Sequence, residues 1–159
     1  MLARGVFISD SSQEISLLLV SDKGIGRTTA FSNFTRVAPA LFNNKPIVIL
    51  LSCATDHVKS ELARRTIIEV IADEFQAVTG MAVRERSSSM ELSINPLIDC
   101  LIENKAFLML IVDDLDVLYR SDSSILPKMA ASINELIDIA ESKSGRLTCT
   151  VSGSSFVLE

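Results

Sequence analysis

The sequence predicts an α/β fold, a three-layer sandwich in which a mostly parallel sheet of four to five strands carries helices on both faces. Short apolar runs alternate with amphipathic stretches along the chain. The runs are hydrophobic at consecutive positions, which is typical of parallel strands buried on both faces. Aromatic residues make up only 5% of a chain that is 48% hydrophobic, so aliphatic side chains must form the core. We expect one domain over residues 1–159.

The first half of the chain is expected to hold two strands and two helices. Residues 15–20 (ISLLLV) predict a short strand, and residues 28–41 follow as a helix that NNKP ends. Residues 47–54 (IVILLSCA) predict the second strand, and Asp56 is a suitable N-cap for a helix over residues 57–78. The apolar positions of these helices that we expect in the core are Phe31, Phe34, Val37, Ala38, Leu41, Val58, Leu62, Ile67, Ile68, Ile71, Phe75 and Val78.

The second half repeats this alternation. A helix is predicted over residues 92–104, and the apolar strand 107–114 (FLMLIVDD) ends on two carboxylates. Residues 119–124 (YRSDSS) predict a polar loop, residues 125–142 an amphipathic helix, and residues 147–155 (LTCTVSGSS) a last strand with a small-residue turn. RGVFISD near the N-terminus could supply an additional edge strand.

Composition limits the function classes. A net charge of -5 argues against non-specific nucleic-acid binding, which requires a basic surface. No apolar run approaches the roughly 18–20 residues of a membrane span, and no signal peptide is evident, so we expect a cytoplasmic or nuclear protein. The cysteines Cys53, Cys100 and Cys149 form no paired motif and are expected as reduced, buried thiols.

The stretch SDKGIGRTT, residues 21–29, has the parts of a phosphate-binding loop between a strand and a helix. Gly26 and Thr28 match the second glycine and the Mg²⁺-binding hydroxyl of G-x-x-x-x-G-K-[ST], whereas Ser21 replaces the first glycine and Arg27 the lysine. An ordinary glycine-containing turn is the alternative interpretation. The residues predicted to contact the nucleotide are Lys23, Gly24, Ile25, Gly26, Arg27, Thr28 and Thr29.

Two further strand ends carry polar residues that suit the same chemistry. Asp113 could hold Mg²⁺ together with Thr28, and Asp114 could polarise the attacking water. Ser152 and Ser154 could contact the γ-phosphate or that water. Alternatively, the carboxylates simply meet solvent and the serines form an ordinary turn.

In these three stretches the chain resembles the ATPase core of P-loop NTPases of the AAA+ and STAND type. SDKGIGRTT is similar to the Walker A loop, FLMLIVDD to the Walker B strand and LTCTVSGSS to the sensor-1 strand, and the resemblance covers residues 15–155. It implies a P-loop NTPase-like sheet with the sensor strand between the two Walker strands, and ATP and Mg²⁺ as cofactors. The helical lid of that family has no evident counterpart in the chain.

The resulting hypothesis is an ATP-binding P-loop domain with weak or partner-dependent ATP hydrolysis. Arg27 is bulkier than lysine, and Asp114 is one methylene shorter than the family's glutamate. We therefore expect these differences to lower the rate of ATP hydrolysis more than the affinity for nucleotide. The alternative is a degenerate P-loop domain that acts as a non-catalytic protein-interaction module. Unpaired sheet edges would then recruit a second copy or a larger protein assembly. A phosphoacceptor receiver-like domain fits less well, because its acid pair belongs on the first strand.

Overall fold

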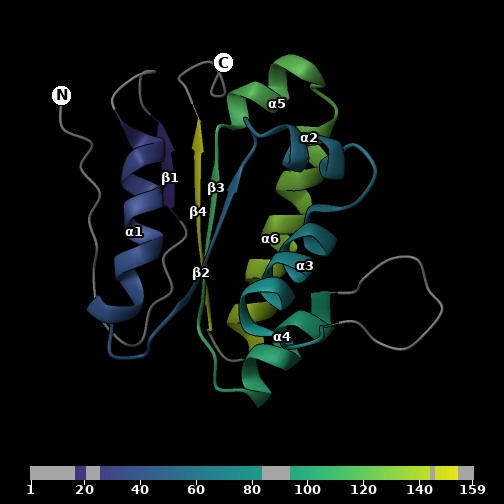
Figure 1. Cartoon of the computed structure of the whole chain (residues 1–159). Helices are drawn as coiled ribbons and strands as arrows, with labels where there is room; N and C mark the ends of the chain where they lie inside the picture. Colours follow the sequence, from purple (N-terminus) through teal and green to yellow (C-terminus); the bar gives the residue numbers. More distant parts are fainter. Residues whose placement is uncertain (1–16, 21–25, 84–93, 144–145, 154–159) are drawn as a thin grey trace.

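The computed structural model describes residues 17–20, 26–83, 94–143 and 146–153. Within these ranges the chain forms four strands and six helices (Figure 1). In chain order the elements are β1 (Leu17–Val20), α1 (Arg27–Leu41), β2 (Ile47–Ser52), α2 (Asp56–Leu62), α3 (Ile67–Thr79), α4 (Ile94–Glu103), β3 (Leu108–Asp113), α5 (Leu115–Ser121), α6 (Ile125–Lys143) and β4 (Leu147–Gly153).

The strands form a parallel sheet in the order β1-β4-β3-β2. The last strand, β4, therefore lies between β1 and β3, as the resemblance implied for the sensor and Walker strands. The described part of the chain has four strands and not five, and the additional edge strand expected from RGVFISD lies outside the described residues. In the register of β2 and β3, Ser52 is paired with Asp113 at the carboxyl ends of both strands.

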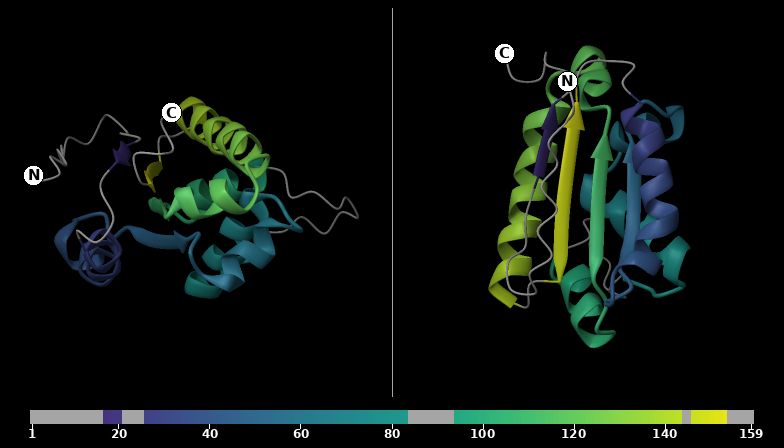
Figure 2. Two further views of the ribbon diagram at one scale, coloured as in Figure 1. Left: turned by 90° about the horizontal axis from the view of Figure 1, so that it is seen from above. Right: turned by 90° about the vertical axis from the view of Figure 1, so that its left-hand side faces the viewer.

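The handedness of the connections explains the three layers. The crossover from β1 to β2 runs across the sheet in one direction, and the connections from β2 to β3 and from β3 to β4 run back in the other. Right-handed crossovers must then place their helices on opposite faces. Accordingly, of the described helices only α1 lies on one side of the sheet, and α2 to α6 lie on the other side (Figures 1 and 2).

The two faces of the sheet are unequally buried. Alternate residues of β2, β3 and β4, such as Leu51, Leu110 and Cys149, join the core beneath the larger helical layer. On the other face α1 packs against β2, and it buries only Ala38 among its apolar positions.

Three of the residues expected in the core are exposed instead, and Phe31 and Phe34 are only partly buried. Val37 and Leu41 on α1 are 41% and 69% exposed, because a single helix on its face of the sheet has an outer side that meets solvent. Val78, near the end of α3, is 61% exposed.

The expected helix over residues 57–78 is two helices in the structure. Thr66 begins α3 with a capping box, in which its hydroxyl accepts from the backbone N–H of Glu69 and the Glu69 carboxylate accepts from the Thr66 N–H. Thr55, and not Asp56, caps α2 by accepting a hydrogen bond from the Val58 N–H. The stretch expected as a polar loop over residues 119–124 begins instead as the last turn of α5.

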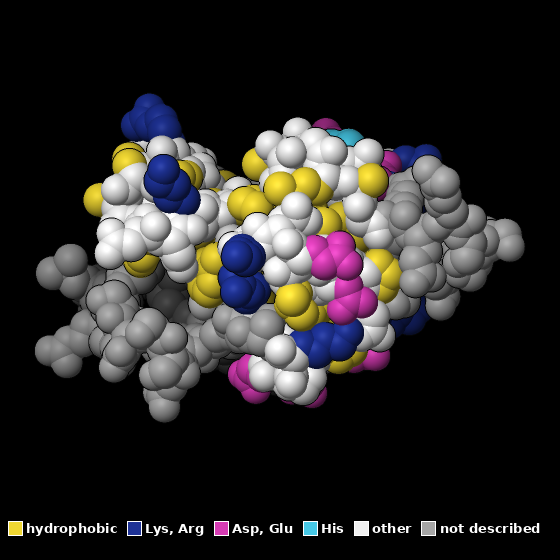
Figure 3. Space-filling model, turned by 90° about the horizontal axis from the view of Figure 1, so that it is seen from below, with side chains coloured by type: hydrophobic (Ala, Val, Ile, Leu, Met, Phe, Trp, Pro, Cys, Tyr) yellow, Lys and Arg dark blue, Asp and Glu magenta, His cyan; other side chains and the backbone are white. Residues whose placement is uncertain are grey.

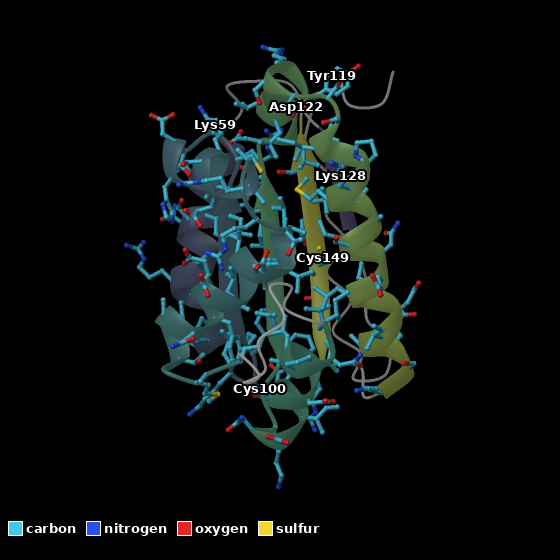
Figure 4. The ribbon with its side chains drawn as sticks, turned by 90° about the vertical axis from the view of Figure 1, so that its right-hand side faces the viewer. Lys59, Cys100, Tyr119, Asp122, Lys128 and Cys149 are labelled. Atoms are coloured by element: carbon cyan, nitrogen blue, oxygen red, sulfur yellow. The ribbon has the colours of Figure 1, made fainter. Side chains whose placement is uncertain are left out.

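The three cysteines are free thiols, as expected from the sequence. Cys53 and Cys149 are fully buried, whereas Cys100 on α4 is partly exposed. Figure 4 shows Cys149 beside the middle of β4 and Cys100 at the lower end of the molecule. Burial raises the pKa of both Cys53 and Cys149 to about 12, so these two thiols stay protonated at neutral pH.

Candidate functional site

The predicted site residues converge at the carboxyl edge of the sheet, the upper edge in Figure 1. The ends of β2, β3 and β4 meet there, together with the first residues of α1 and α5. In open parallel sheets this is the edge at which ligands bind, because strand ends and helix N-termini face the same space. The opposite edge, seen from below, carries basic, acidic and apolar side chains interspersed (Figure 3).

Gly26 is the N-cap of α1 and has a left-handed backbone with φ of 81°. A side chain at this position would be strained, which explains the glycine. The first turn of α1 contains no acidic residue, and its N-cap makes no side-chain hydrogen bond. This helix start can therefore offer N–H groups and its dipole to an anion. Thr29 is exposed in the same turn, whereas Lys23, Gly24 and Ile25 lie outside the described residues.

Arg27 turns its guanidinium inward across the strand ends. Its Nε donates to Asp113 Oδ1 at 2.8 Å, Nη1 donates to the carbonyl oxygen of Gly153 at 3.0 Å, and Nη2 lies 3.4 Å from Asp114 Oδ1. The Arg27 side chain is 12% exposed. One side chain of α1 is thereby bound to the ends of both β3 and β4.

Asp113 is completely buried and receives three further hydrogen bonds. Thr28 Oγ1 donates to Oδ2 at 2.8 Å, the backbone N–H of Asp114 donates to Oδ1 at 2.9 Å, and Ser152 Oγ also donates to Oδ1. A buried carboxylate is tolerated only when it is paired and hydrogen-bonded, and these donors meet that condition. Asp113 therefore does not meet solvent, unlike in the alternative considered from sequence.

Asp114 connects β3 to α5 with a left-handed backbone, φ 62°. Aspartate tolerates this conformation better than most residues, which suits it to the abrupt turn. Ser52 Oγ donates to Asp114 Oδ2 at 2.9 Å, and Arg27 approaches the other oxygen. Both carboxylate oxygens thus have partners within the protein.

The structure brings together Arg27, Thr28, Asp113, Asp114 and Ser152, which we call the strand-end cluster. Ser154 lies outside the described residues. Sequence reasoning missed Ser52, although it too is the polar residue at the end of an apolar strand, and it missed the part played by the Gly153 carbonyl. Asp116, in the first turn of α5, is also buried.

Cys53 borders the cluster, because its backbone N–H donates to the carbonyl oxygen of Asp113 at 2.9 Å. Burial raises its pKa to about 12, and the negative charges of Asp114 and Asp113 act in the same direction. The Cys53 thiol is therefore unsuited to act as a nucleophile near neutral pH.

Two other features are absent from the described residues. No group of three or more His, Cys, Asp and Glu side chains arranged to hold a metal ion occurs among them. None of the described helices combines the length and the hydrophobicity that crossing a membrane requires.

The topology is that of an α/β fold with a parallel sheet, and the cluster lies at the carboxyl edge of that sheet. Among solved structures, the chain is similar to the ORC2 protein of Aeropyrum pernix in its ADPNP–ADP complexes, with a TM-score of 0.55 and 18% identity. The match covers 91% of this chain and 36% of that protein, so this chain spans just over a third of its length. At this identity the similarity shows the fold alone. No protein-family model matches the chain, and no curated protein matches it.

Proposed function

We propose that the chain binds a nucleoside triphosphate, with ATP as the expected ligand, where α1 begins beside the ends of β3 and β4. The observation that carries this proposal is the strand-end cluster itself. Its members come from three separate stretches of sequence, each of which was suited to phosphate chemistry, and Arg27 and Asp113 are 86 residues apart. The fold shared with a protein solved in complex with ADPNP and ADP supports the same proposal.

The start of α1 supplies the phosphate contacts in this proposal. The N–H groups of its first turn and the helix dipole favour an anion, and residues 23–28 would wrap their backbone around the phosphates. Arg27, the first residue of α1, adds a positive charge beside this helix start while it holds the carboxylates, and this charge favours a bound phosphate. Thr28 adds a hydroxyl at the same place.

ATP hydrolysis, in this proposal, is weak or depends on a partner. Asp114 is the group expected to orient water, yet its two oxygens are engaged by Ser52 and Arg27. A general base must hold a lone pair within reach of the water, and these two contacts leave Asp114 fewer lone pairs and less freedom to turn toward it. Ser152 is similarly occupied by Asp113. Ser154 remains a proposed contact to the γ-phosphate.

The test is a titration of the purified chain with a fluorescent ATP analogue. We expect saturable binding in the micromolar range, weakened about tenfold or more by Thr28→Ala, since one charge-assisted contact accounts for about that factor. Thr35→Ala, two turns further along α1, is the matched control and should bind as the wild type does. Absence of saturable binding at millimolar nucleotide, with circular dichroism showing a folded protein, would reject the proposal.

A second function, a non-catalytic interaction module, is favoured by one observation. The outer side of α1 exposes Val37 and Leu41, although the sequence pattern assigned both to a core. A second copy of the chain or a larger protein assembly would bury them. Light scattering after size exclusion, without nucleotide, should then show self-association that Leu41→Ser abolishes. A monomer at all concentrations would count against self-association as this function.

A further inference from the structure

We infer that Arg27 is the resident cation of the strand-end cluster: its guanidinium occupies the place beside Asp113 that a divalent ion would need, and it excludes Mg²⁺ from this site. The inference concerns the protein without nucleotide. Its extension, that nucleotide binding is independent of metal, rests on the proposed function.

The hydrogen bonds of Asp113 test whether Mg²⁺ fits. Arg27 Nε, Ser152 Oγ and the Asp114 N–H donate to Oδ1, and Thr28 Oγ1 donates to Oδ2. These four donors match the roughly four lone-pair sites of a carboxylate. Magnesium requires oxygen lone pairs in near-octahedral geometry, and those of Asp113 are already engaged. The other predicted ligand, Thr28, lies beside Asp113 but donates its hydroxyl hydrogen there and keeps its own lone pairs.

The charge of Arg27 opposes a second cation in the same place. Arginine stays protonated at every accessible pH, and this guanidinium contacts both carboxylates of the cluster while only 12% exposed. A divalent ion beside Asp113 would meet this charge at short range in a poorly screened environment. To admit the ion, Arg27 would have to leave Asp113, Asp114 and the Gly153 carbonyl together.

The shape of the guanidinium explains why lysine would behave differently. Three different nitrogens of Arg27 reach three acceptors, which lie at the end of β3, at the start of α5 and at the end of β4. A lysine ammonium is a compact charge on a flexible stem and cannot span these acceptors in the same way. Arg27→Lys should therefore loosen the cation from Asp113 and open the site to a metal ion.

The experiment is a titration of the nucleotide-free full chain with Mn²⁺, a divalent probe whose free ion gives an electron paramagnetic resonance signal. We expect the wild type to bind no Mn²⁺ below about 1 mM. Arg27→Lys and Arg27→Met should each acquire one site at least about tenfold tighter, which corresponds to about 1.4 kcal/mol. Adding Asp113→Asn to either variant should abolish that site.

Two results would overturn the inference. One is saturable Mn²⁺ binding by the wild-type protein that is lost in the Asp113→Asn variant. This comparison requires no variant of Arg27. The other is the absence of Mn²⁺ binding in folded Arg27→Lys. Lysine retains a positive charge near the buried carboxylate, so this variant remains informative if Arg27→Met does not fold.

A nucleotide titration separates this inference from the proposed function. In EDTA and in Mg²⁺, the wild type should bind the fluorescent ATP analogue with dissociation constants within about threefold of each other. Arg27→Lys should bind at least about tenfold more tightly with Mg²⁺. If neither the wild type nor Arg27→Lys binds nucleotide, the proposed function is wrong. The Mn²⁺ titration still decides whether Arg27 excludes the metal.

Discussion

Asp113 is the residue that holds the parts of the candidate site together. Its fully buried carboxylate accepts hydrogen bonds from α1, from β4 and from the backbone that follows it. A buried charge of this kind contributes stability only while its donors remain in place. The candidate site is therefore also part of the structural core at the carboxyl edge of the sheet.

Asp113→Ala should lower the free energy of unfolding by about 3–5 kcal/mol, because it leaves the Arg27 guanidinium without its buried partner. The matched control is Asp99→Ala. Asp99 pairs with Lys143 at 2.7 Å, but the two side chains are 52% and 35% exposed, so about 0–1 kcal/mol is expected. Urea denaturation of both variants measures the difference. Equal losses of stability in the two variants would show that the contacts of Asp113 contribute no more to the free energy of unfolding than an exposed ion pair does.

At the residue scale, the sequence predicted several of the side chains that meet, but it missed Ser52 and did not predict how they pair. Arg27, Thr28 and Asp113 were predicted from their positions beside strand ends. The contact of Arg27 with Asp113 could not be predicted, because it depends on the strand order and on the path of a long side chain across three strand ends. The motif associates the basic residue with phosphate and says nothing of its partners without a ligand.

Among the elements, the break between α2 and α3 shows how local signals compete. Apolar residues at helical spacing continue from Val58 to Phe75, which is why the sequence predicted one helix. The break was nevertheless visible, since Thr66 and Glu69 have the spacing of a capping box. Helix α5 was harder to predict because it has only seven residues and begins at a left-handed aspartate.

Thr66→Ala should lower the free energy of unfolding by about 1 kcal/mol, since it removes the hydroxyl that caps the first turn of α3. Gln76→Ala, at an exposed position in the same helix, is the control and should change stability by less than about 0.5 kcal/mol. Thermal and urea denaturation of the two variants provide the measurement. A Thr66→Ala variant as stable as the wild type would mean that packing alone defines the start of α3.

For the whole molecule, the strands and their parallel arrangement were the most predictable part. The strands β1, β2 and β3 are short runs of mostly aliphatic residues, whereas β4 includes polar residues between its apolar ones. The alternation of strands with helices predicts the layers. The unequal burial of the two sheet faces was not predictable. It depends on the strand order, because the direction of each crossover decides on which face of the sheet its helices lie. The helical spacing on α1 therefore indicated a buried stripe where the structure exposes Val37 and Leu41.

The same burial pattern predicts the reactivity of the thiols. At pH 9, an exposed thiol is about half ionised, whereas Cys53 and Cys149, with pKa values raised to about 12, stay protonated. We expect Ellman's reagent to modify one thiol of the native protein, the partly exposed Cys100, and to modify all three only after unfolding. Cys100→Ser should remove the reaction of the native protein. Rapid modification of a second thiol would contradict this burial.

Stability should also depend on these two thiols at high pH. The unfolded chain releases their protons near pH 9, whereas the folded chain holds them until about pH 12. The contribution of Cys53 and Cys149 to the free energy of unfolding is therefore complete below pH 9 and decreases as the pH rises toward 12. Urea denaturation of wild type and Cys149→Ala across this range measures the contribution of one thiol.

The strand order also determines when the sheet can be completed during synthesis. Within the described residues β1 pairs only with β4, and Arg27 is 126 residues away from its partner Gly153. A ribosome adding about 5–20 residues per second needs on the order of ten seconds to cover that distance, far longer than a helix takes to form. The layer built on β2 and β3 can therefore assemble first. The first strand joins the sheet only when β4 emerges, and the hydrogen bond from Arg27 to the Gly153 carbonyl oxygen is among the last contacts of the strand-end cluster to form.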